Sequence, residues 1–219
     1  MKVGIIAPIK FLERYCVTPI QYCLPSLVVE NTSYKNFYIK KKKIGNIIIS
    51  DSRKVGWRRT PEDFEVIREA LKLIERDIIV APSYMFNLKA SLEMYEYFLA
   101  NFPTYTNKII RCLEGTSEED VVIFPKSKII AVPSHMYRYI GGIKFNSNTI
   151  YLENHISIDE LDNRKGILVT SLPIRLGLQG RLLSNNRPAP DSLSFFEEED
   201  RYPKIVEKNI KDIIDYYEE

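Results

Sequence analysis

The chain has 219 residues, 45% of them hydrophobic, which is enough for one substantial core, so we expect a single domain over residues 1–219. Its 31 basic and 29 acidic residues give a formal net charge of +2, a balance that does not by itself indicate nucleic-acid binding. No apolar run approaches the roughly 18 residues that a membrane helix needs, so we expect no membrane partner.

The three cysteines, Cys16, Cys23 and Cys112, follow no metal-ligand spacing, and no signal peptide is recognisable. An odd number of cysteines without such a spacing favours a reducing compartment, so we expect a cytoplasmic protein, or one of the host cytoplasm if the source is viral. The sequence predicts no metal site and no cofactor. It leaves the oligomeric state open, with a homodimer as one option.

The first part of the chain gives one clear element and two ambiguous ones. The apolar run at residues 3–7 predicts a strand. Residues 19–29 predict a helix that Pro25 kinks or ends. The Tyr- and Lys-rich segment 31–43 fits either a strand or a packed loop around Phe37, Tyr38 and Ile39.

The strand at residues 47–49 is the most distinctive, because three isoleucines in a row predict burial on both faces. It ends in Asp51, Ser52 and Arg53, an acid, a hydroxyl and a base. A helix with Thr60 as N-cap and Pro61 at its first position follows, and its apolar face includes Phe64, Ile67, Leu71 and Ile74.

The same alternation continues to the end of the chain. Further strands are predicted at residues 78–82, 108–113, 128–132, 149–153 and 167–171, and helices over 88–99 and after the capping boxes at 116–119 and 157–160. Pro173 opens a helix or a turn, residues 184–202 form a loop, and residues 203–219 form a C-terminal helix.

Seven clear strands alternating with helices predict an α/β fold with a parallel sheet, most simply a small or incomplete (β/α) barrel of the TIM type. The alternative is an open doubly wound sheet. That fold usually places a Gly-rich phosphate turn after the first strand, and Ala7-Pro8-Ile9-Lys10 is not one.

The carboxyl ends of parallel strands share one face, where barrel active sites lie. The predicted ends carry Asp51, Ser83, Tyr84, Glu114, Gly115 and Thr116, both histidines (His135 and His155), and Glu153, Thr170 and Ser171. Asp51 is the strongest catalytic candidate, although capping a turn is an equally good explanation for it. For Glu114 and the histidines a structural role is the more common one.

Two stretches could bind phosphate or sugar. The basic residues Arg53, Lys54, Arg58 and Arg59 flank Trp57, which could stack on a base or simply belong to the core. The stretch 170–181 follows a strand end with two glycines and two arginines, so Arg175, Gln179 and Arg181 could hold ribose or phosphate. The alternative for this stretch is a helix that uses glycine for close packing.

From residue 47 to residue 180 the order of short motifs resembles the tRNA-guanine transglycosylases, most closely their short phage and archaeal relatives that insert 7-deazaguanine bases into DNA. The motifs are Ile49-Ser50-Asp51-Ser52, Ile79-Val80-Ala81-Pro82-Ser83 with Ala90-Ser91-Leu92-Glu93, Cys112-Leu113-Glu114-Gly115, Ile130-Ala131-Val132-Pro133 and Leu168-Val169-Thr170-Ser171-Leu172-Pro173.

The resemblance implies base exchange at an anomeric carbon, with guanine or 7-deazaguanine in DNA or tRNA as substrate and the logic of paired-carboxylate glycosyl transfer. Asp51 falls on the family's acid/base aspartate. Val169 stands where the family has its nucleophilic aspartate, Ser83 where it has a base-recognising aspartate, and Glu114 where it has a glutamine. The family's zinc-binding cysteine cluster is absent.

The implied site therefore has Asp51 and Glu114 as catalytic residues. Its substrate-binding residues are Ser52, Ser83, Tyr84, Gly115, His135, Thr170, Ser171, Arg175 and Gln179, and its nucleic-acid contacts are Arg53, Lys54, Trp57, Arg58, Arg59 and Arg181. Because Val169 cannot form a glycosyl ester, several alternatives stay open. In the first alternative, another acid such as Glu114 or Glu153 replaces the nucleophile. In the second, Asp51 activates water to hydrolyse an N-glycosidic bond. In the third, the chain binds nucleic acid or a nucleoside without catalysis. A sugar- or phosphate-binding barrel unrelated to nucleic acid is a further possibility.

Overall fold

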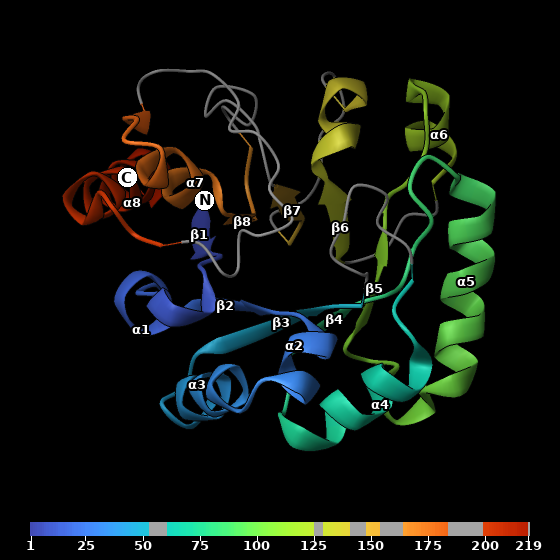
Figure 1. Ribbon diagram of the computed structural model, residues 1–219. Coiled ribbons are helices and arrows are strands. Elements are labelled where there is room, and N and C mark those ends of the chain that lie inside the picture. Colours follow the sequence, from blue (N-terminus) through green and yellow to red (C-terminus); the bar gives the residue numbers. More distant parts are fainter. Residues whose placement is uncertain (53–60, 125–128, 141–147, 154–163, 184–198, 219) are drawn as a thin grey trace.

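The computed structural model describes residues 1–52, 61–124, 129–140, 148–153, 164–183 and 199–218. Within these residues, eight strands form a closed barrel in chain order, and each neighbouring pair, including β8 with β1, is parallel (Figure 1). The strands are β1 (Lys2–Ile5), β2 (Ile20–Cys23), β3 (Ile47–Asp51), β4 (Ile78–Val80), β5 (Ile109–Cys112), β6 (Ile130–Pro133), β7 (Ile150–Glu153) and β8 (Ile167–Thr170). This topology confirms a TIM-type α/β barrel and excludes the open sheet.

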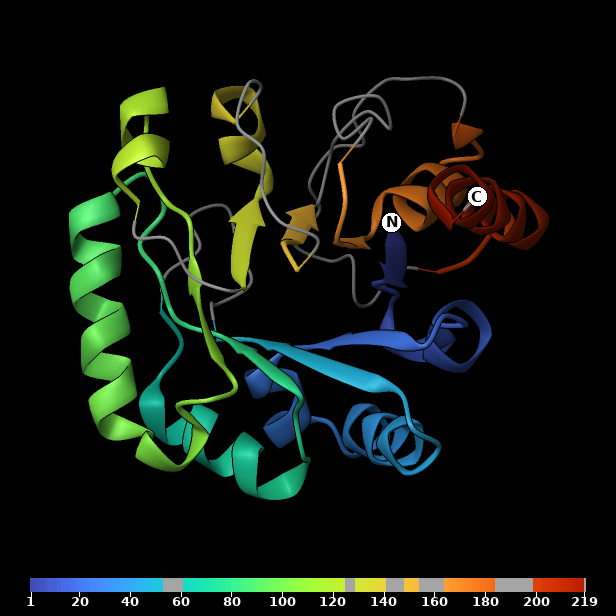
Figure 2. The ribbon, with the colours of Figure 1, turned by 180° about the vertical axis from the view of Figure 1, so that it is seen from behind.

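Helices surround the barrel. In the described part of the chain they are α1 (Leu12–Tyr15), α2 (Pro25–Glu30), α3 (Thr32–Lys43), α4 (Phe64–Leu73), α5 (Leu88–Asn101), α6 (Glu118–Ile123), α7 (Leu172–Leu178) and α8 (Pro203–Glu218), with short 3-10 turns η1 (Ile9–Phe11), η2 (Pro103–Tyr105) and η3 (Ser134–Tyr139). Figure 2 shows α5 along the outside of the barrel, whereas α6 and η3 stand beyond the ends of β5 and β6. No described helix combines the length and the apolar character required to cross a bilayer.

Strand residues alternate between the barrel interior and the layer under the helices. On β3, Ile47 and Ile49 belong to the interior cluster, whereas Ile48 packs in the outer cluster. On β8, Val169 lies inside and Leu168 outside. A strand has a side-chain period of two, so a polar residue at an inward position near a strand's carboxyl end faces the mouth of the barrel.

The predicted helix over residues 19–29 is wrong in its first half, where the chain forms β2, the eighth strand of the barrel. Pro25 then occupies the start of α2, where its missing N–H is not needed. The undecided segment 31–43 is neither strand nor loop. Asn31 caps it as helix α3 by accepting a hydrogen bond from the backbone N–H of Tyr34.

Two predicted helix starts are displaced. Helix α4 begins at Phe64 with Asp63 as N-cap, so Pro61 is not its first residue, and Thr60 lies outside the described residues. Helix α6 is capped by Ser117, which forms a reciprocal capping box with Asp120, one residue later than predicted. The predicted capping box at 157–160 and most of the predicted loop 184–202 also lie outside the described residues.

The first and last elements of the described chain close the barrel together. Strand β1 is in register with β2 at Gly4 and Ile20 and with β8 over its whole length. The backbone N–H of Val3 donates to Oε1 of Glu218 on α8, at 3.0 Å, instead of to a strand carbonyl. The C-terminal helix therefore supports the join between β1 and β2.

Candidate active site at the carboxyl ends of the strands

Asp51 ends β3 at an inward position, two residues after Ile49 of the interior cluster, and is 1% exposed. The hydroxyl of Tyr22, an interior residue of the neighbouring strand β2, donates to its Oδ2 at 2.5 Å. The hydroxyl of Tyr38 on α3 in turn donates to the carbonyl oxygen of Tyr22. A buried carboxyl group is thus held at the mouth of the barrel by a phenol donor from the adjacent strand.

Glu114, Ser83 and His135 form a second buried cluster, which we call the Glu114 cluster. These residues follow the consecutive strands β5, β4 and β6, and Glu114 is 1% exposed. Ser83 Oγ donates to Glu114 Oε1 at 2.8 Å, and Nε2 of His135 lies 2.8 Å from Glu114 Oε2. Cys112 Sγ lies 3.6 Å from Glu114 Oε1. The structure therefore brings together three of the residues that the sequence predicted for one pocket.

The contact between His135 and Glu114 requires a proton. Two lone pairs at 2.8 Å would repel, so either Nε2 of His135 carries hydrogen or the carboxyl group of Glu114 does. His135 is nearly buried, with 13% of its side chain exposed, so the pair is largely shielded from water. An imidazole and a carboxyl group this close, one of them protonated, can deliver a proton to a substrate or accept it back.

Phe86 adds an aromatic surface to the Glu114 cluster. Its ring packs edge-on against the ring of His135, with centroids 4.8 Å apart, yet it is 46% exposed. Its φ of 65° makes it the one non-glycine residue with positive φ in the described chain, a conformation that a bulky residue rarely adopts. Ser91 fixes this turn by bonding both the N–H and the carbonyl of Tyr84, whose side chain is also exposed.

Hydrogen bonds link the end of β8 to the start of α7. The backbone N–H of Leu172 donates to Oγ1 of Thr170, and Nε of Arg175 donates to Oγ of Ser171 at 2.8 Å. All of these residues are buried, Arg175 included. Their visible bonds stabilise the start of α7, so their predicted role in holding sugar or phosphate stays a prediction.

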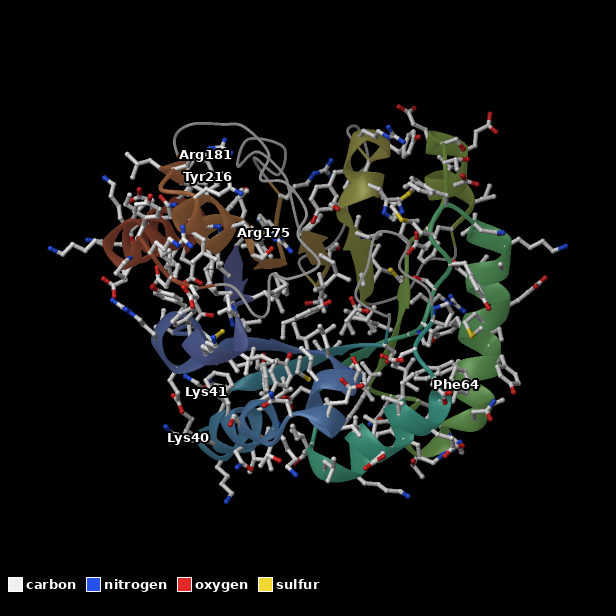
Figure 3. The ribbon with its side chains drawn as sticks, in the orientation of Figure 1. Lys40, Lys41, Phe64, Arg175, Arg181 and Tyr216 are labelled. Carbon is white, nitrogen blue, oxygen red and sulfur yellow. The ribbon has the colours of Figure 1, made fainter. Side chains whose placement is uncertain are left out.

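Gln179 and Arg181 lie past the end of α7, where Nη1 of Arg181 donates to Oε1 of Gln179 in an exposed contact. Arg175, labelled with Arg181 in Figure 3, is buried, whereas the contact of Arg181 with Gln179 is exposed. The two arginine side chains therefore lie in different environments. Val169 is fully buried in the barrel interior, so an aliphatic side chain fills the position that the resemblance assigns to the nucleophile.

Two further predicted residues have structural contacts. Gly115 allows α6 to begin close to β5, because a Cβ at this position would lie 2.5 Å from Cβ of Asp120. Ser52 is fully buried, and its backbone bonds Val80 and Glu62, while its Oγ has no hydrogen-bond partner among the described residues. Arg53, Lys54, Trp57, Arg58, Arg59 and His155 lie outside the described residues.

The described part of the chain was also compared with the ligand sets of metal ions and with reactive thiols. No three His, Cys, Asp or Glu side chains there are grouped to hold a metal ion. Cys16, Cys23 and Cys112 are buried as free thiols. Burial raises the pKa of Cys16 to about 12 and also raises the pKa of Cys23, so both are protonated and poorly nucleophilic at neutral pH.

Sequence reasoning missed Tyr22 and Phe86. Tyr22 fell in a segment predicted as helix, which hid its inward position beside Asp51. For Phe86 the sequence holds one weak indication of a special role. An aromatic residue is unusual in a tight turn, and Phe86 directly precedes Asn87, the N-cap of α5.

Comparisons with known proteins do not assign a family. No protein-family profile matches the chain, and no curated protein matches it by sequence. Among solved structures it is similar to N-(5'-phosphoribosyl)anthranilate isomerase from Pyrococcus furiosus, with 12% identity, a TM-score of 0.48 and coverage of 99% of each chain. It is also similar to CdNal from Clostridium difficile in complex with mannosamine, with 13% identity, a TM-score of 0.45 and coverage of 99% of this chain and 98% of the other. Likeness at this level carries no argument about activity, and the fold assignment therefore rests on the closed parallel barrel itself.

Proposed function

We propose that the chain is an acid–base enzyme that cleaves an N-glycosidic bond to a purine-type base, with water or a second base accepting the sugar. The observation that carries the proposal is the pair of buried carboxyl groups at one end of the barrel, each held by a hydroxyl donor. Tyr22 bonds Asp51 and Ser83 bonds Glu114. Glycosyl chemistry commonly uses two carboxyl groups in different environments.

Different roles for the two acids follow from their partners. Asp51 is the general base that accepts a proton from water as the oxygen of water bonds to the anomeric carbon. The bond from that carbon to the base nitrogen breaks, and its electron pair stays with the base. A proton from the Glu114–His135 pair then neutralises the departing base. Asp51 returns its proton through solvent. In base exchange an incoming base replaces water and gives its N–H proton to Asp51.

The choice of a planar base rests on the aromatic side chains beside the Glu114 cluster. Tyr84 and Phe86 are both exposed, and Phe86 contacts His135 directly. Stacking on such rings stabilises a nucleobase by about 1–3 kcal/mol. The motif order that resembles the transglycosylases supports the same class of substrate, guanine or 7-deazaguanine in DNA, tRNA or a nucleoside. A buried valine in place of the family nucleophile favours direct displacement over a covalent intermediate.

The test follows two products at once. The chain is incubated with guanosine, with 7-deazaguanosine, and with DNA and tRNA in the presence of labelled guanine, and both released base and incorporated label are measured. We expect Asp51→Asn to lower the rate by at least about 100-fold and Glu114→Gln to have a similar effect. Glu119→Gln, an exposed acid of α6, is the matched control and should leave the rate unchanged.

Two results would refute the proposal. One is a wild-type chain that neither releases nor exchanges a base on any of these substrates. The other is turnover in Asp51→Asn equal to that of the wild type. Salt-dependent binding of DNA or tRNA without turnover would instead identify a nucleic-acid-binding barrel that is not an enzyme.

A further inference from the structure

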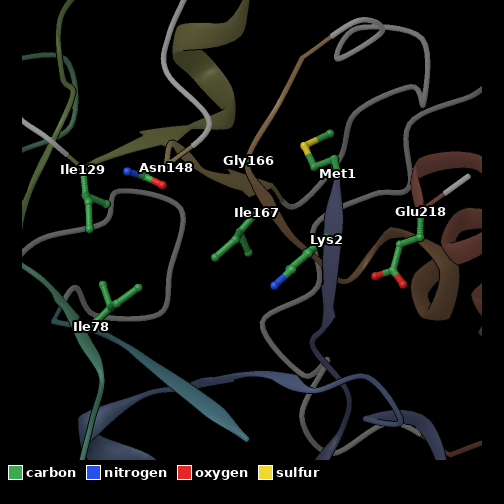
Figure 4. Close-up of a pocket in the computed structure, with 8 residues that line it drawn as sticks. All are labelled: Met1, Lys2, Ile78, Ile129, Asn148, Gly166, Ile167 and Glu218. Atoms are coloured by element: carbon green, nitrogen blue, oxygen red, sulfur yellow. The ribbon is translucent and has the colours of Figure 1, made fainter.

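The barrel has a cavity at the amino ends of its strands, on the face opposite the Glu114 cluster, which we call the lower cavity. This cavity has a volume of about 580 Å³ and is drawn in Figure 4. Ile78 and Ile167 open β4 and β8, and Ile129 directly precedes β6. All three are only partly buried where they pack against the interior cluster, so they present an apolar floor to the cavity.

The two mouths of the barrel are separated by packed side chains. Ile49, Val80, Ile110 and Val169 fill the interior between them. A molecule in the lower cavity therefore cannot touch Asp51 or Glu114. The volume of the cavity falls in the range of about 300–1,000 Å³ that is typical of pockets for small molecules.

Lys2 places a cation on the rim of this cavity. Lys2 of β1 lines the cavity with an exposed side chain, and within the part of the chain that the structure describes its ammonium has no hydrogen-bond or ion-pair partner. Figure 4 shows Lys2 reaching from β1 toward Ile167 and Ile78. The acid on the rim, Glu218, lies on the other side of β1 in this view and accepts the backbone N–H of Val3.

We infer that the lower cavity binds a small monocarboxylate with an apolar ring or a short alkyl body. The apolar body covers the isoleucine floor, where each Å² removed from water contributes about 25 cal/mol. The carboxylate pairs with Lys2, and the amide of Asn148 lies on the same rim. A phosphate ester or a dianion fits less well, because the lining offers one unpaired lysine and also contains the carboxylate of Glu218.

The test uses 4-phenylbutyrate as the probe and 4-phenyl-1-butanol as its uncharged counterpart, with the full chain labelled at isoleucine methyl groups. We expect 4-phenylbutyrate to shift the methyl resonances of Ile78, Ile129 and Ile167 in a saturable titration. Lys2→Gln should weaken its binding about tenfold and leave binding of the alcohol unchanged. Lys10→Gln, at an exposed lysine of η1 that does not line the cavity, is the matched control and should bind both probes like the wild type.

Three results would overturn the inference. They are no saturable shift of these methyl groups at about 10 mM probe, equal affinity of Lys2→Gln and the wild type, and shifts confined to residues around Asp51. A second copy of the chain filling the cavity would appear as concentration-dependent sedimentation together with no response to the probe, which also refutes it. None of these outcomes depends on whether the chain cleaves N-glycosidic bonds.

Discussion

The bond between Tyr22 and Asp51 fixes a buried carboxyl group at the mouth of the barrel through a phenol hydroxyl. A hydrogen bond to an ionised group contributes about 1.5–3 kcal/mol, and a bond to a neutral group about 1 kcal/mol. The free energy that this hydrogen bond contributes to folding therefore distinguishes an ionised Asp51 from a neutral one.

We expect Tyr22→Phe to lower the free energy of unfolding by about 2–3 kcal/mol at pH 7, because the carboxylate loses its phenol donor. Urea denaturation measures this loss. Tyr97→Phe, at an exposed tyrosine of α5, should leave stability nearly unchanged. A loss no larger than about 1 kcal/mol in Tyr22→Phe would indicate that Asp51 is uncharged in the folded chain.

Buried thiols make the chain sensitive to alkali. Burial raises the pKa of Cys16 from 9.0 in the unfolded chain to about 12 in the folded one. Between these values the unfolded chain has released a proton that the folded chain still holds, so stability is constant below pH 9 and falls as pH rises toward 12. This one group contributes a slope of up to about 1.4 kcal/mol per pH unit. Urea denaturation of the wild type and of Cys16→Ala at pH 8 and pH 10 should show a smaller decrease in the variant, and equal decreases would contradict the assignment.

At the scale of single residues, the sequence predicts where the two acids lie but not which side chains contact them. Asp51 and Glu114 were identified from their positions after apolar runs, and the structure places both at the mouth of the barrel. Tyr22 is 29 positions from Asp51 in the chain, so their contact could not be inferred before β2 was known to lie beside β3.

At the scale of elements, Gly→Ala substitutions at two glycines with positive φ compare two contributions to stability. One is the free-energy cost of a left-handed backbone, and the other is the cost of a steric clash. Gly166 has φ of +139°, and a Cβ there would lie 2.1 Å from the carbonyl oxygen of Thr149. Gly45 follows α3 with φ of +89°, and a Cβ there would meet nothing within 4 Å. Gly45→Ala should cost about 1–2 kcal/mol from the left-handed backbone alone. Gly166→Ala should cost clearly more by thermal or urea denaturation, and equal losses would show that the loop before β8 can move away from Thr149.

Asn209 of α8 joins three backbone groups near α7. Its Oδ1 accepts the N–H of Leu183, and its Nδ2 donates to the carbonyl oxygens of Pro173 and Arg181. Because Asn209 is fully buried, Asn209→Ala leaves these groups without a side-chain partner, and we expect a loss of about 2–4 kcal/mol. Lys208→Ala on the exposed face is the matched control. Denaturation curves that coincide for both variants would exclude this role.

The element type is predictable where an apolar run has clear boundaries, and the prediction fails at β2, where a proline follows the run closely. Seven strands and helices α5 and α8 are predicted where the structure has them, whereas the predicted start of α4 is too early. Strand β2 was missed because it ends two positions before Pro25, the residue that opens α2. In the sequence, β2 and α2 therefore resemble a single helix kinked at the proline. Only the closure of the barrel, which needs a partner between β1 and β3, distinguishes the two.

For the whole molecule, one domain over residues 1–219 stays a prediction. It is supported by an interior cluster to which strands from β2 to β8 all contribute. We expect a single calorimetric transition whose calorimetric and van't Hoff enthalpies agree. Two separable transitions would show that parts of the chain unfold independently.

The barrel join at β1 has a consequence for exchange with solvent. Because the amide of Val3 is bonded to the side chain of Glu218, its protection against deuterium depends on α8 staying docked and not on a strand neighbour. Fraying of the last helical turn would expose this amide while the amides that β1 donates to β8 stay slow. A single fast-exchanging proton in the first strand would then report how often the final helix lifts away from the barrel.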